Sequence, residues 1–139
     1  MRTHVPETGV DFIRANGIEH GYFSVGEGPL VLMFHGFPDT PHTWDGIREP
    51  VARAGFRVVT PFLRGYAPSG IPERDTDART QGEDVVALID AFGAEKAHLV
   101  GHDWGASAVY AAASLAPERV ERLATVAIPH PASLKPSLR

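Results

Sequence analysis

The chain has 139 residues, a length typical of a single domain that buries a sizeable core. Hydrophobic residues make up 43% and charged residues 22%, as in ordinary globular proteins. The formal net charge is −4, and the positive residues are scattered, so we expect no nucleic-acid partner. No cysteine is present, which excludes disulfides and thiolate chemistry and fits a cytoplasmic protein.

Two targeting classes are also disfavoured by the sequence. No apolar run approaches ~20 residues, so we expect no membrane span. Residues 1–20 lack the apolar segment of a signal peptide. The sequence therefore predicts a protein without a membrane partner.

The first predicted elements form an antiparallel hairpin. Residues 11–15 and 18–23 flank Asn16 and Gly17, a pair that supplies the positive φ angles of a two-residue turn. Residues 30–34 follow as a continuous apolar run of strand length. Such a run predicts a strand buried on both faces, as in a parallel sheet.

The next segment predicts a broken helix and a strand. The helix is expected over residues 43–47 and again over 50–54, with Pro50 at the start of the second part, where its missing N–H costs little. Gly55 ends it, and residues 56–60 read as a strand. A loop over residues 61–77 then holds an Arg-Gly-Tyr motif and several prolines.

A second helix is predicted after a capping box at residues 80–83, Thr-Gln-Gly-Glu. Val85, Leu88, Ile89 and Phe92 have the spacing of one apolar helix face. Gly93 has the position of the glycine that follows a helix end. The segment therefore predicts an amphipathic helix that ends near residue 92.

The last elements alternate in the same way. We expect a strand over residues 97–101, a helix over 105–115 stopped by Pro117, and a strand over 123–128 closed by residues 129–131. Strands that alternate with helices after an antiparallel start predict an α/β fold. The expected sheet is mostly parallel, with an N-terminal antiparallel hairpin and flanking helices.

Asp103 stands at the junction of that strand and that helix. Gly101 and Gly105 flank it in the small-x-nucleophile-x-small pattern of a nucleophile elbow. Glycines leave room for a strained turn that lifts the central side chain clear of the sheet. A carboxylate held there can attack carbon and form an ester. The alternative is a helix N-cap, but the glycine spacing on both sides favours the nucleophile.

Three motifs occur in order at predicted strand ends. They are His-Gly-Phe-Pro at residues 35–38, Arg-Gly-Tyr at 64–66, and Gly-His-Asp-Trp-Gly at 101–105. Together they resemble the α/β-hydrolase fold over residues 10–131, in the branch that has an aspartate nucleophile. That branch contains epoxide hydrolases, haloalkane dehalogenases and haloacetate dehalogenases.

The resemblance implies roles for particular residues. Asp103 would be the nucleophile, and the backbone N–H groups of Phe37 and Trp104 would form the oxyanion hole. His35 would support a neighbouring loop, and Pro38 would follow a cis peptide bond. The residues that support the motifs are His35, Gly36, Pro38, Gly101 and Gly105. No cofactor and no metal is implied, and His20, His98 and His102 lack metal-ligand spacing.

Two positions favour the epoxide hydrolases. Haloalkane dehalogenases commonly carry Asn where this chain has Phe37, and haloacetate dehalogenases usually carry Arg where it has Trp104. The implied substrate is a small apolar electrophile, an epoxide or an alkyl halide. A haloalkane or haloacetate dehalogenase-like hydrolase and a non-catalytic, self-associating fold fragment remain the alternatives.

The family's general base and its acid lie beyond a cap domain, and neither has a counterpart here. Downstream of Asp103 the only histidine is His130, and the only acids are Glu118 and Glu121. The chain thus resembles the N-terminal part of such an enzyme, a single incomplete core domain over residues 1–139, which leaves turnover in doubt. His130 is a possible substitute base because it ends a strand on the same rim, although a loop histidine is the favoured interpretation.

The strand at 123–128 would be left with an open edge. In the full fold, further strands pair beyond it, and an open apolar edge invites pairing with another chain. We therefore expect a homo-oligomer or a sheet-completing partner at this edge.

Overall fold

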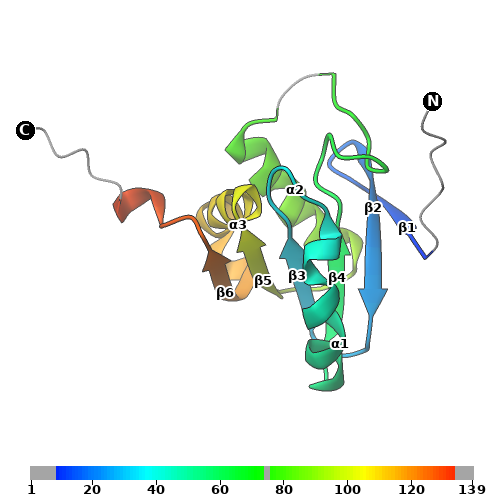
Figure 1. Ribbon diagram of the computed structural model, residues 1–139. Helices are drawn as coiled ribbons and strands as arrows, with labels where there is room; N and C mark the ends of the chain where they lie inside the picture. The colour runs from blue at the N-terminus through cyan, green and yellow to red at the C-terminus, as the bar shows by residue number, and fades with distance from the viewer. Residues whose placement is uncertain (1–8, 74–75, 134–139) are drawn as a thin grey trace, which may run out of the picture.

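Six strands form one mixed sheet in the order β1-β2-β4-β3-β5-β6 in the computed structural model, which describes residues 9–73 and 76–133 (Figure 1). β3, β4, β5 and β6 run parallel, whereas β1 and β2 are antiparallel to each other and β2 is antiparallel to β4. The predicted α/β class and its antiparallel start are confirmed. The strands are β1 (Asp11–Ala15), β2 (Ile18–Val25), β3 (Leu30–Phe34), β4 (Arg57–Pro61), β5 (Ala97–His102) and β6 (Val120–Val126).

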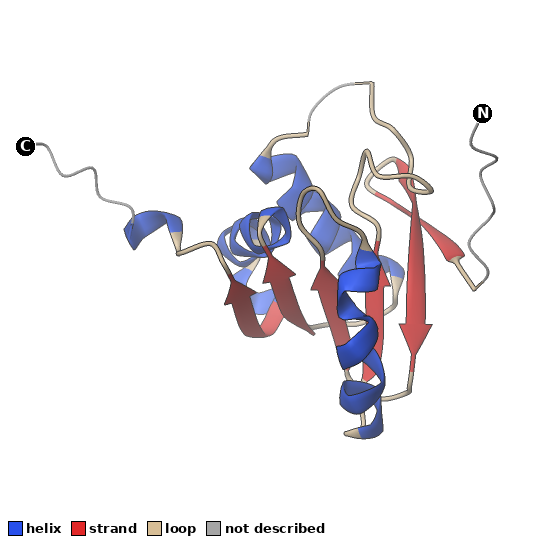
Figure 2. Ribbon diagram, viewed as in Figure 1, coloured by secondary structure: helices blue, strands red, loops and turns tan. Residues whose placement is uncertain are grey.

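Helices flank this sheet (Figure 2). Three are α-helical: α1 (Asp45–Arg53), α2 (Ala78–Ala91) and α3 (Trp104–Leu115). Three short 3-10 turns are η1 (Pro41–Trp44), η2 (Pro117–Arg119) and η3 (Pro131–Ser133). Across residues 9–73 and 76–133, none of the helices has the length and apolar character needed to cross a bilayer. Residues 1–8, which belong to the stretch considered above for a signal peptide, lie outside the described ranges.

The predicted hairpin and the doubly buried strand are both confirmed. Asn16 and Gly17 have φ angles of 49° and 76° between β1 and β2, as the two-residue turn requires. In β3, successive side chains point to opposite faces. Leu32 and Phe34 join the core beneath α2 and α3, while Val31 and Met33 join the core beneath α1. The sheet is therefore the middle of three layers.

The helix after β3 differs from the broken one predicted. η1 runs directly into α1, and Pro50 lies inside that helix rather than at the start of a second part. A proline there removes one backbone bond, to the carbonyl of Gly46. Both Pro50 and Gly46 are exposed, so water can satisfy that carbonyl and the helix continues.

The start of α2 also differs from the prediction. Its N-cap is Asp77, whose side chain accepts a 2.7 Å hydrogen bond from the backbone N–H of Thr80. The capping box at 80–83 is therefore wrong, because Asp caps a helix as well as Thr does and it lies one turn earlier. The predicted end is confirmed, since Phe92 is the C-cap and Gly93 has a φ of 74°.

The last strand begins earlier than predicted. β6 spans Val120–Val126 instead of 123–128. Among residues 9–73 and 76–133 it is an edge strand that pairs with β5 alone, so charged residues such as Glu121 and Arg122 fit on it without being buried. Ala127 has a φ of 73°, which ends the strand before residue 128.

Candidate active site

Asp103 occupies the sharp turn between β5 and α3, at the carboxyl end of the parallel strands. Its φ of 56° and ψ of −118° are unusual for a residue with a side chain. Its backbone N–H donates a 3.2 Å hydrogen bond to the carbonyl of Val126 at the end of β6. Asp103 stands at the N-cap position of α3, as the helix-cap alternative expects, but its side chain makes no N-cap hydrogen bond. The carboxylate is instead presented beside the loop that follows β3.

Three glycines make room for this turn. A Cβ at Gly101 would collide with the backbone of Gly105, and a Cβ at Gly105 would collide with the backbone carbonyl of Phe34. A Cβ at Gly36 would lie 2.5 Å from the Cβ of Asp103. The elbow and the loop after β3 therefore approach each other at distances that only glycine permits.

The backbone around the carboxylate donates to it. The N–H of Phe37 lies 3.0 Å from Oδ1 of Asp103. Hydrogen bonds from the N–H of Phe37 and then from the N–H of Trp104 lower the pKa of Asp103 below its ordinary value. The carboxylate is therefore ionised at neutral pH, which is the nucleophilic form. The peptide bond between Phe37 and Pro38 is cis, as the resemblance implied.

Two exposed aromatic side chains flank the carboxylate. Phe37 is 60% exposed and Trp104 is 45% exposed, and their ring centroids lie 5.6 Å apart. Trp104 also lines a recess of about 280 Å³. It is lined by Thr76, Asp77, Ala78, Gln81, Trp104 and Ser107. Two exposed aromatic rings thus lie next to the charged carboxylate of Asp103.

His35 is fully buried and uses both ring nitrogens. Nε2 accepts a 3.0 Å hydrogen bond from the backbone N–H of Leu63, so in the neutral ring Nδ1 carries the proton. Nδ1–H donates a 2.9 Å hydrogen bond to the carbonyl oxygen of Gly36. Burial lowers the pKa of His35, which keeps the ring neutral. His35 therefore links the loops after β3 and β4, and neither nitrogen is available as a base.

In the described part of the chain, the contacts of His130 are with residues other than Asp103. It is exposed, its ring contacts Tyr110 with centroids 5.1 Å apart, and its Nδ1 accepts a 3.1 Å hydrogen bond from the N–H of Ala132. In the neutral ring that bond places the proton on Nε2, which removes the free lone pair that a base needs. Within residues 9–73 and 76–133, His130 makes no hydrogen bond to Asp103. Glu118 and Glu121 lie around the amino end of β6, at the opposite edge of the sheet.

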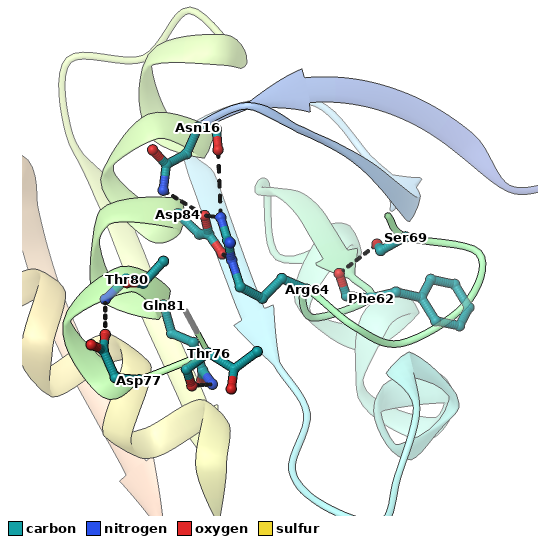
Figure 3. Close-up of polar contacts among 9 residues, drawn as sticks. All are labelled: Asn16, Phe62, Arg64, Ser69, Thr76, Asp77, Thr80, Gln81 and Asp84. Carbon is teal, nitrogen blue, oxygen red and sulfur yellow. Dashed lines mark hydrogen bonds and ion pairs between the residues drawn. The ribbon is translucent and has the colours of Figure 1, made fainter. Parts of the chain in front are cut away.

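Sequence reasoning did not identify a buried polar cluster around Arg64 and Asp84 (Figure 3). Arg64, in the loop after β4, donates to both carboxylate oxygens of Asp84 in α2 at 2.7 Å. Asn16, from the β1–β2 turn, donates to the same carboxylate at 2.8 Å. The available signal was that Asp84 lies on the apolar face of α2, one residue before Val85. A charge at such a position needs a buried partner.

Tyr66 is a further residue that sequence reasoning did not assign. It lies two residues beyond Arg64, and its ring meets the ring of His35 edge-on with centroids 4.9 Å apart. Burial, followed by the negative charges of Asp103 and Asp39, raises the pKa of Tyr66. Tyr66 therefore remains a neutral phenol near the carboxylate.

Comparison with known proteins identifies the family. Residues 29–137 match the model of the alpha/beta hydrolase fold. The chain is 39% identical over 128 residues to the AB hydrolase superfamily protein YfhM of Bacillus subtilis, covering 89% of this chain and 45% of that protein. It is 40% identical over 120 residues to an epoxide hydrolase of Caballeronia sordidicola, covering 84% of this chain and 36% of that protein.

A solved structure agrees with these relatives. The crystal structure of epoxide hydrolase A from Mycobacterium thermoresistibile superposes with a TM-score of 0.83 at 37% identity, covering 86% of this chain and 39% of that one. The chain thus spans less than half the length of each relative named here. Residues 29–137 include strands β3 to β6, the strained turn at Asp103 and the loop that carries Phe37. The chain belongs to the alpha/beta hydrolase fold family.

Proposed function

We propose that the chain provides the nucleophilic part of an α/β-hydrolase of epoxide-hydrolase type, with Asp103 as the nucleophile. The observation that carries the proposal is the 3.0 Å hydrogen bond from the N–H of Phe37 to Oδ1 of Asp103. It fixes one carboxylate oxygen and leaves the other available for attack. The epoxide hydrolases among the relatives support the reaction class.

The reaction begins when Oδ2 of Asp103 attacks a carbon of the epoxide ring. A carbon–oxygen bond forms between enzyme and substrate, and the carbon–oxygen bond of the strained ring breaks. The electron pair of that bond stays on the ring oxygen, which takes a proton from water and becomes a hydroxyl. The product of this step is a hydroxyalkyl ester of Asp103.

The two backbone N–H groups then act on the oxygen that did not attack. After alkylation Oδ1 is the carbonyl oxygen of the ester, already positioned against the N–H of Phe37. When water adds to the ester carbon, charge develops on Oδ1, and the N–H groups of Phe37 and Trp104 stabilise it. Donors placed in this way before the reaction lower the barrier by several kcal/mol, ~3 kcal/mol for one donor.

The ester is expected to accumulate on this chain. Its hydrolysis needs a base that activates water, and neither His35 nor His130 offers a free nitrogen near Asp103. We therefore expect alkylation without efficient release.

The test is intact-protein mass spectrometry after incubation with styrene oxide, followed by peptide mapping. We expect one adduct with the mass of the epoxide, located on Asp103. Asp103→Asn removes the nucleophile and should give no adduct. Asp39→Asn is the matched control, because Asp39 lies in the loop after β3 and its carboxylate accepts from the N–H of Thr40 rather than from that of Phe37. A parent chain that stays unmodified, or an adduct that survives Asp103→Asn, would refute the proposal.

Substrate choice is part of the proposal. Phe37 offers a halide only its backbone N–H, whereas an epoxide needs no halide-binding side chain. The apolar surface of Phe37 and Trp104 suits a small apolar electrophile. Parallel incubations with styrene oxide and 1-bromobutane should alkylate Asp103 faster with the epoxide. Bromide release without any epoxide adduct would favour a dehalogenase instead.

We propose also that β6 pairs with a strand of a second copy or of a sheet-completing partner. β6 is an edge strand with exposed apolar side chains, Leu123 at 37% and Val126 at 53%. Such an edge presents unpaired backbone groups to other chains. Light scattering should detect an oligomer, and replacement of both Leu123 and Val126 by Lys should reduce it. A monodisperse monomer would contradict self-association.

We infer a cytoplasmic location from the absence of cysteine, which fits a reducing compartment. Fractionation of the source cells tests this directly.

A further inference from the structure

A buried ion pair joins three segments that are distant in the sequence. Arg64 and Asp84 are only 6% and 7% exposed, and Asn16 completes the cluster from the β1–β2 turn (Figure 3). Arg64 also donates to the backbone carbonyl of Asn16, at 3.4 Å. One guanidinium therefore ties the loop after β4 to both the hairpin and α2.

The hydrogen-bond geometry of this pair indicates its role better than its contribution to stability does. The desolvation of two buried charges offsets most of their attraction, so such a pair adds little net stability over an apolar pair. A planar guanidinium bound through two parallel hydrogen bonds does, however, fix both position and orientation. The cluster is thus better suited to hold the backbone at Arg64 in one place than to stabilise the fold.

That backbone leads directly to the proposed site. Leu63, the neighbour of Arg64, donates its N–H to Nε2 of His35 at 3.0 Å. Nδ1 of His35 bonds the carbonyl of Gly36 at 2.9 Å. The next residue, Phe37, donates its N–H to Asp103. Each step is a single hydrogen bond or a single peptide unit, and the residues between the ends are buried.

The far end of the same loop is held independently. Ser69 accepts from the N–H of Gly21 and donates to the carbonyl of Phe62, while Gly70 donates its N–H to Glu19. The bonds to Gly21 and Glu19 attach the loop to β2, as does the bond from the N–H of Phe62 to the carbonyl of Gly21, whereas the bond from Ser69 to Phe62 lies within the loop. They do not constrain it against α2, which is the contact that Arg64 and Asp84 provide.

We infer that Arg64 and Asp84 are positioning residues for the reaction proposed above, because they hold Leu63 and His35 so that the N–H of Phe37 points at Asp103. The inference rests on the proposed role of Asp103 as nucleophile. The ion pair touches no substrate and acts only through His35 and the loop after β3. Its loss displaces the Phe37 N–H while leaving the nucleophile itself in place.

The test compares two identical substitutions in one helix. Asp84→Asn removes the charge and one acceptor oxygen of the buried pair. Asp90→Asn is the matched control, since Asp90 also lies in α2 and also pairs with an arginine, Arg119, which leads away from the site. Two quantities are measured: the rate of Asp103 alkylation by styrene oxide, and the pKa of Asp103 by NMR titration of labelled aspartate.

A third variant guards against misfolding. Asp84→Asn removes the negative charge that Arg64 contacts at 2.7 Å and can unfold the chain. The double variant Arg64→Met with Asp84→Leu replaces the pair by apolar side chains of similar size, which folds commonly tolerate. The double variant keeps a similar side-chain volume but lacks the hydrogen bonds between residues 64 and 84. Circular dichroism verifies that the variant is folded.

We expect Asp84→Asn and the double variant to alkylate about tenfold more slowly than the parent, a size typical of small misplacements of reacting groups. Both should raise the pKa of Asp103, since the Phe37 hydrogen bond is the main cause that lowers it. Asp90→Asn should leave both quantities unchanged. Parental rates and pKa in the folded double variant, or equal losses in Asp90→Asn, would overturn the inference. If the parent forms no adduct, the proposed function fails, and the pKa of Asp103 alone decides the inference.

Discussion

The backbone N–H of Phe37 and Oδ1 of Asp103 lie 3.0 Å apart, although 66 positions separate the two residues in the sequence. They meet because β3 and β5 are parallel neighbours, so the turns that follow them share one edge of the sheet. Gly36 allows the close approach because it has no Cβ. The backbone of Asp103 at this turn has a strained conformation. The carboxylate is therefore held in a defined orientation before any substrate arrives.

Strain at Asp103 predicts an unusual order of stabilities. Asp103→Gly and Asp103→Ala both remove the carboxylate and its hydrogen bonds, but only Gly accommodates a φ of 56° with a ψ of −118° freely. The Gly variant should be more stable than the Ala variant by about 1 kcal/mol. Urea denaturation measures the free energies of unfolding. Equal stabilities would mean that the turn is not strained.

The close approach at Gly36 gives a second prediction. A Cβ at this position would lie 2.5 Å from the Cβ of Asp103, so Gly36→Ala must displace the loop or the elbow. We expect the free energy of unfolding to fall by about 1–3 kcal/mol, and the alkylation of Asp103 to slow.

The control for this substitution is Gly46→Ala. Gly46 lies in α1, and a Cβ there meets nothing within 4 Å. Ala favours the helix over Gly by up to about 1 kcal/mol, so stability should be unchanged or higher. A loss of stability in Gly46→Ala as large as in Gly36→Ala would contradict the steric explanation.

The bounds of a strand could be predicted from the sequence where all of its side chains are buried. The residues of β3 are all buried, so its apolar run has sharp ends and the predicted range 30–34 is the observed one. β6 is exposed along much of its length, and its charged first half carried no strand signal. A strand buried on both faces thus has a continuous apolar run whose ends can be predicted, whereas an edge strand mixes polar and apolar residues.

The site was predictable where a local motif encodes it. The glycines around Asp103 and the loop at residues 35–38 are required by steric constraints between residues close in the sequence. A short sequence motif therefore contains the information. The contact between Arg64 and Asp84 spans 20 positions with no periodic relation. Only the packing of α2 against the loop after β4 brings the two together, so the sequence pattern indicates that Asp84 needs a buried partner but does not identify Arg64 as that partner.

The buried histidines predict how stability depends on pH. His20 and His35 are 1% and 0% exposed, and burial lowers the pKa of both below 6.5. The unfolded chain then binds more protons than the folded chain between pH 6.5 and the lowered pKa values. Stability is full above pH 6.5 and falls as the pH drops below it, by at most ~1.4 kcal/mol per pH unit for each histidine.

Urea titrations across this pH range measure the slope. His20→Met removes one titrating group and fills a similar volume, so it should make the slope shallower. An unchanged slope in this variant would show that His20 titrates equally in the folded and unfolded states.

The N-terminus of α2 distinguishes the observed cap from the one that the sequence favoured. The carboxylate of Asp77 accepts from the N–H of Thr80, and this bond is the main cause that lowers the pKa of Asp77. Asp77→Ala should therefore lower the melting temperature more than Thr80→Ala, and Asp77→Asn should retain most of the stability. Because the pKa is lowered on folding, the charge contributes stability at neutral pH that is lost in acid as Asp77 is protonated. In acid, the melting temperatures of Asp77→Ala and the parent should therefore converge. A larger decrease of the melting temperature in Thr80→Ala than in Asp77→Ala would instead support the capping box at residues 80–83.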